Sequence, residues 1–138
     1  MDDAQRLIDR GHTARRDGNP ALALELYEAA AEVLRNVNAP LRLAHTIRHV
    51  ADIQRGLNLL EPAQSHYAEA LAIYRNEPTT GKLDLANTLR GYALLSQSIG
   101  DSSAARAMWT EASSHYKAAE VQAGVEEAER RLATMSLG

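Results

Sequence analysis

The chain has 138 residues, a formal net charge of −3 and 24% charged residues. Its length fits one domain with a real core, and its charge lacks the basic excess of a nucleic-acid binder, so nucleic acid is not an expected partner. The absence of cysteine excludes disulfides, thiolate metal sites and cysteine nucleophiles. The N-terminus carries two acids where a secretory signal needs basic residues, and no window approaches the roughly 18 apolar residues of a membrane span. We therefore expect a single cytoplasmic domain, residues 1–138, with no membrane association.

The composition favours helices, because alanine is abundant, phenylalanine is absent and there is a single tryptophan. GNP at 18–20 combines a glycine stop, an asparagine N-cap and a proline at the first helical position, and GDSS at 100–103 is similar. NAP at 38–40 and EP at 61–62 mark two more helix starts. Periodicity between these signals predicts seven helices, in chain order 3–17, 20–36, 40–56, 60–76, 83–99, 102–119 and 122–136.

Three of the predicted helices share one pattern, an alanine followed four residues later by an aromatic residue and then by another alanine. The three runs, each 40 or 42 residues after the one before, are Ala23-Tyr27-Ala30, Ala63-Tyr67-Ala70 and Ala105-Trp109-Ala112. Twelve residues before each run, the preceding helix has a small residue: Gly11, Ala51 or Ala93. We interpret each pair as a helix–turn–helix unit whose small residue permits close approach. The aromatic residues are then core, and the pairs must stack to bury their apolar faces.

This repeat resembles the tetratricopeptide repeat family. Leu7, Ile47 and Leu89 lie four residues before the small residues and complete the first half of the family pattern, while the alanine–aromatic runs match the second half. The resemblance covers nearly the whole chain. The family's closing proline is absent, which fits the long period and is similar to the repeats of kinesin light chains. The resemblance implies an all-α solenoid of three helix pairs, about 3–36, 40–76 and 83–119, with a capping helix at about 122–136.

The resemblance also implies that the first helix of each pair lines a concave groove. On the helix at 40–56 the residues left outside the core share one face, and the other first helices and the capping helix supply matching positions. The expected groove residues are His12, Arg15, His45, Arg48, His49, Asp52, Arg55, Asn87, Arg90 and Arg130. Such a basic groove suits a protein or peptide with an acidic segment or a C-terminal carboxylate. We therefore expect an adaptor or scaffold, with no enzymatic activity and no cofactor.

Two functional alternatives stay open at this stage. His45 and His49 lie four residues apart with Asp52 one turn later, which is a spacing for a metal-binding enzyme or sensor. Against it, the helix lacks the glutamate of zinc proteases, and an arginine beside the histidines would repel a cation. The second alternative is self-association through an apolar end of the array, such as the edge formed by Leu7 and Ile8.

The last predicted helix has two interpretations. Its acids Glu126, Glu127 and Glu129 could cover the end of the array as the polar face of a capping helix. They also complement the groove arginines, so the same helix could act as an internal ligand. We favour the capping role.

Overall fold

The computed structural model describes residues 2–137, with side chains described as far as Met135. Within that range it contains seven helices and no strand, which confirms the all-α prediction. The helices are α1 (Asp3–Arg16), α2 (Pro20–Arg35), α3 (Pro40–Gly56), α4 (Leu60–Asn76), α5 (Lys82–Ser98), α6 (Ser102–Ala118) and α7 (Gln122–Leu137). Each boundary lies within about one residue of its predicted position. No helix of this part of the chain is long and apolar enough to cross a membrane.

Local chemistry explains where the helix pairs turn. The side chains of Asn19 and Asp101 each accept a hydrogen bond from the backbone N–H three residues later, at 3.2 and 3.1 Å, so both act as N-caps. The turn within each pair contains one residue with positive φ: Gly18 at 78°, Asn58 at 63° and Gly100 at 84°. Glycine and asparagine tolerate this left-handed conformation better than other residues. The same turn therefore recurs after 40 and 42 residues.

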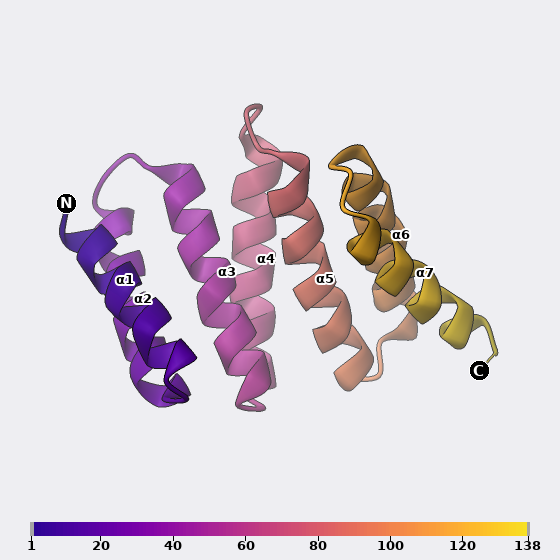
Figure 1. Ribbon diagram of the computed structural model, residues 1–138, viewed down its shortest axis with the longest axis horizontal. Helices are drawn as coiled ribbons and strands as arrows, with labels where there is room; N and C mark the ends of the chain where they lie inside the picture. The colour runs from indigo at the N-terminus through magenta and orange to yellow at the C-terminus, as the bar shows by residue number, and fades with distance from the viewer. Residues whose placement is uncertain (1, 138) are drawn as a thin grey trace. The chain divides into compact units, whose positions relative to one another are not determined.

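The chain divides into two compact units, which are described separately. Unit 1 extends to Glu77 and contains α1 to α4; α1 packs on α2, α3 packs on α4, and α2 also packs on α3. Its first helices, α1 and α3, lie on one side and its second helices on the other (Figure 1). Unit 2 begins at Pro78, and its α6 packs against both α5 and α7.

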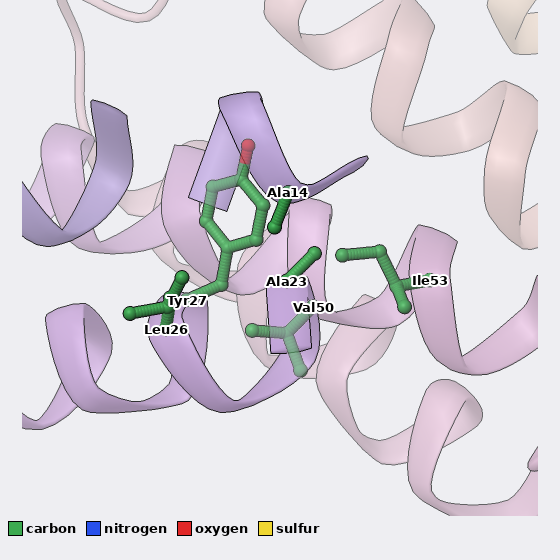
Figure 2. Close-up of a cluster of buried hydrophobic side chains, with 6 residues drawn as sticks. All are labelled: Ala14, Ala23, Leu26, Tyr27, Val50 and Ile53. Atoms are coloured by element: carbon green, nitrogen blue, oxygen red, sulfur yellow. The ribbon is translucent and has the colours of Figure 1, made fainter. Parts of the chain in front are cut away.

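The repeated aromatic residues form the core of each pair, as predicted. The side chains of Tyr27, Tyr67 and Trp109 are all fully buried. Figure 2 shows Tyr27 within a cluster that contains Ala14, Ala23, Leu26, Val50 and Ile53. A Cβ atom placed on Gly11 would lie 3.1 Å from the Tyr27 ring, so the small residue does allow close approach. Burial of these large rings contributes to the stability of each pair.

Leu7 and Ile8 expose less apolar surface than the sequence predicts for an end of the array that could self-associate. Both side chains are partly buried and pack against the cluster around Tyr27. Their apolar surface is therefore largely used within unit 1.

Candidate functional site

The predicted groove residues fall into two groups, one in each unit. In unit 1 they lie on α1 and α3, exposed on α1 and half-buried on α3, and are here called the α1/α3 face: His12, Arg15, His45, Arg48, His49, Asp52 and Arg55. In unit 2 they lie on α5 and α7, here called the α5/α7 face: Asn87, Arg90 and Arg130. Within each group, side chains contact one another directly or share one hollow.

A cluster of four rings is the centre of the α1/α3 face. The His49 ring stacks on the Tyr27 ring, with centroids 5.2 Å apart and an interplanar angle of 9°. His12 and His45 meet the same His49 ring edge-on, at centroid distances of 5.4 and 4.7 Å. The Tyr27 hydroxyl and Nδ1 of His12 form a hydrogen bond. A core aromatic of α2 thus positions histidines on both α1 and α3.

His49 is held as a neutral ring with a defined tautomer. An Nη atom of Arg15 lies 3.3 Å from His49 Nδ1. A guanidinium has only donors, so Nδ1 must accept and the ring proton is on Nε2. Burial is the largest cause that lowers the pKa of His49 to about 2, and the charge of Arg48, followed by those of His45, His12 and Arg15, contributes to this value. His49 is therefore uncharged at neutral pH.

Asp52 organises the arginines of the same face. Its carboxylate accepts from Nη1 of Arg48 at 3.0 Å and lies 3.8 Å from Nη2 of Arg55. It also accepts from the Tyr67 hydroxyl of α4, which in turn accepts from Arg55 Nε at 3.1 Å. Burial, followed by the Asp52 charge, raises the pKa of Tyr67 well above its ordinary value. The hydroxyl is thus a permanent donor to Asp52.

Two N–H donors of this face are covered and lack an acceptor. They are Nε of Arg48 and Nε2 of His49, which have no hydrogen-bond partner among the described residues. An unsatisfied buried donor costs about 1–3 kcal/mol. The α1/α3 face therefore has donors to offer to an acceptor brought by a ligand.

The geometry does not support the metal alternative. His45 and His49 do lie side by side, but Asp52 is engaged by two arginines and a tyrosine. No group of three His, Cys, Asp or Glu side chains in residues 2–135 could hold a metal ion. The third histidine of the cluster, His12, uses its Nδ1 in the hydrogen bond with the Tyr27 hydroxyl, and the charge of Arg48 lies beside His49.

On the α5/α7 face, the predicted residues are already engaged within unit 2. Asn87 Oδ1 accepts from the Tyr116 hydroxyl at 2.7 Å. Arg90 donates to Glu127 of α7 through Nε at 2.5 Å and through Nη2 at 3.1 Å. A hollow of about 440 Å³ lies here, and Asn87, Arg90, Tyr116, Glu127 and Arg130 are among its lining residues.

Tyr27, Tyr67, Tyr116 and Glu127 take part in these sites but are not among the predicted site residues. Tyr27 and Tyr67 were expected only as core, yet their hydroxyls bond to His12 and Asp52, each 15 residues earlier in the chain. This constant offset within a repeat is the sequence signal that could have identified both pairs. Glu127 is one of the acids that the sequence predicts to cap the array or to complement the groove arginines, and the sequence does not single out Arg90 as its partner.

Comparison with known proteins agrees with this architecture. The tetratricopeptide repeat model matches residues 3–76, more than half of the chain, and the chain therefore belongs to the tetratricopeptide repeat family. Repeats of this family generally mediate protein–protein interaction and are generally not enzymes. The resemblance drawn from the repeated motifs is thereby confirmed.

The fold is also similar to a solved structure. The crystal structure of BtubC (BKLC) from P. vanneervenii superposes with a TM-score of 0.72 at 22% sequence identity, over 96% of this chain and 64% of that one. The chain thus spans less than two thirds of that protein, and at this identity the similarity concerns the fold. No curated protein matches the sequence.

Proposed function

We propose that this chain is an adaptor or scaffold module that binds a protein partner through an acidic segment on the α1/α3 face. Binding of proteins is the general role of the family, and the acidic chemistry is inferred from the charges. Arg15 contacts His49, and both Arg48 and Arg55 lie beside the single carboxylate of Asp52. The excess of positive charge would attract and orient a negatively charged segment.

The observation that carries the proposal is the pair of unsatisfied donors. Nε–H of Arg48 and Nε2–H of His49 each lack an acceptor, and a carboxylate has lone pairs enough for both. Because both atoms are covered, the ligand must displace a neighbouring side chain to reach them. Charge-assisted hydrogen bonds to a carboxylate are about twice as strong as neutral ones and would offset that displacement.

A selection from a random short-peptide library displayed on phage, with the purified full chain as bait, tests this function. The proposal expects selected peptides to be enriched in aspartate and glutamate and to lose affinity as salt is raised. Synthesis of each peptide with a free or an amidated C-terminus then separates side-chain carboxylates from a terminal one. Selected peptides without an acidic excess, or binding that is insensitive to salt, would contradict the proposal.

A further inference from the structure

Arg90 and Glu127 form a two-pronged ion pair that joins α5 to α7. Both carboxylate oxygens of Glu127 are used, one by Nε and one by Nη2 of Arg90, at 2.5 and 3.1 Å. This is the geometry with which arginine recognises a carboxylate. The Glu127 side chain is 18% exposed, and that of Arg90 is 41% exposed. The acid is therefore held inside the site, while the arginine is still open to solvent.

The surroundings of Glu127 contain more positive charge than this one acid neutralises. The hydrogen bond from Arg90 is the largest cause that lowers the pKa of Glu127, and the charges of Arg131 and Arg130 lower it further. Three arginines thus act on a single carboxylate. Arg130 also lines the hollow that contains the ion pair. A second acid from outside the chain would meet Arg90 and Arg130, which both line the hollow, whereas the guanidinium of Arg131 lies over the Trp109 ring.

Apolar contacts hold α7 against the rest of unit 2 in addition to the Glu127 carboxylate. The helix is anchored by buried Val125 and Ala128 and by close approach to the Tyr116 ring, which a Cβ atom on Gly124 would meet at 2.5 Å. Apolar burial of this kind is the main source of helix docking energy. The carboxylate can therefore leave Arg90 while α7 stays in place.

We propose that the α5/α7 face of unit 2 contains a carboxylate-binding site built on Arg90 and Arg130, and that Glu127 is its built-in occupant. An acidic side chain of a protein partner binds there by displacing Glu127. The inference shares its ligand class with the proposed function and rests on it for the existence of such partners. In unit 2 the carboxylate-binding site is already filled by Glu127 of the same chain, whereas the α1/α3 face has unsatisfied donors.

The test is a titration of the full chain with N-acetyl-hexaglutamate amide, monitored through the ¹H–¹⁵N resonance of Arg90 Nε. Replacement of Glu127 by glutamine removes the competing charge and keeps the size of the side chain. If Glu127 occupies the site for about nine-tenths of the time, E127Q binds the probe at Arg90 about tenfold more tightly than the wild type. Addition of Arg90→Gln to this variant should abolish the gain, and the site is then followed through Arg130.

Glu126→Gln is the matched control, because Glu126 is the exposed neighbour and its recorded contact is with Gln122 on its own helix. The inference is overturned if E127Q binds no more tightly than the wild type, or if E126Q gains as much, which would reflect net charge alone. Glu127→Asp, which keeps the charge but shortens the reach, should show a smaller gain than E127Q. Circular dichroism of each variant verifies that α7 is still helical.

The same titration separates this inference from the proposed function. Resonances of Arg15 and Arg48 report on the α1/α3 face of the same molecule. If the probe reaches Arg90 in E127Q but shifts neither of these, the inference stands and the proposed acidic partner on unit 1 fails. If it shifts them but never reaches Arg90 in E127Q, the inference fails and the proposed function stands.

Discussion

Tyr67 on α4 donates its hydroxyl proton to the carboxylate of Asp52 on α3. The ring of Tyr67 is fully buried in the core between α3 and α4. Its hydroxyl thereby holds in place the Asp52 carboxylate, which in turn binds Arg48 and Arg55 of α3. Tyr67 therefore has two roles: its ring packs in the core of the repeat, and its hydroxyl positions a charged residue of the α1/α3 face.

The Tyr67→Phe variant should destabilise unit 1. The substitution keeps the ring but removes a donor from a largely buried carboxylate, whose side chain is 11% exposed. We expect a loss of about 1–3 kcal/mol in the free energy of unfolding. Tyr27→Phe is the comparison, because its hydroxyl bonds to the exposed residue His12, where water can replace the lost partner, so a smaller loss is expected. Urea denaturation followed by circular dichroism measures both; equal losses would refute the special role of Asp52.

The neutral state of His49 predicts a pH dependence of stability. Its pKa is about 2 in the folded chain and about 6.5 when unfolded. Between these values the unfolded chain binds more protons, so stability should fall as the pH drops below about 6.5, by up to about 1.4 kcal/mol per pH unit. Denaturation at pH 7 and pH 5 covers the range in which histidines titrate, and the variant His49→Gln separates His49 from the other four histidines of the chain. The slope should flatten in His49→Gln, and an unchanged slope would show that His49 is not responsible.

Gly124 is predicted to be essential for the docking of α7. A Cβ atom there would lie 2.5 Å from the Tyr116 ring, closer than real contacts permit. We expect Gly124→Ala to destabilise unit 2 by about 1–3 kcal/mol through overpacking. Gly56→Ala is the control, since Gly56 is helical and a Cβ there meets nothing within 4 Å; it should be neutral or stabilising by up to about 1 kcal/mol.

Trp109 offers a convenient measurement for Gly124→Ala. It is the only tryptophan of the sequence and lies fully buried in unit 2. Its fluorescence during thermal unfolding therefore reports on this unit. A melting temperature equal to that of the wild type would mean that Tyr116 moves aside without loss of packing.

The helices could be predicted from the sequence because their signals are local. Asn19 with Pro20, and Asp101 after Gly100, determine where second helices begin through hydrogen bonds within one turn. The positions of Tyr27, Tyr67 and Trp109 then place the repeats in one register. The assignment of the whole chain to one domain stays a prediction. In the structure, the helices group into two compact units.

The side-chain partners of the site could not be predicted in the same way. Arg48 and Arg90 hold equivalent positions in the repeat, yet Arg48 bonds to Asp52 on its own helix and Arg90 bonds to Glu127 on α7. Asp52 lies one turn after Arg48, whereas Leu94 holds that position after Arg90, so Arg90 takes an acid presented by another helix, which the repeat register alone does not determine. The role of these residues in binding a partner stays a proposal.

The most direct test of the central claim compares two neighbouring arginines of α1. Arg15 contacts His49 in the ring cluster, whereas Arg16 is exposed and lies 3.9 Å from its neighbour Asp17. Arg15→Gln and Arg16→Gln remove the same charge from the same helix. Calorimetric titration with the tightest acidic peptide from the library should show a loss of about tenfold, or ~1.4 kcal/mol, for Arg15→Gln and less than about twofold for Arg16→Gln. Equal losses, or no loss at Arg15, would contradict a binding site on the α1/α3 face.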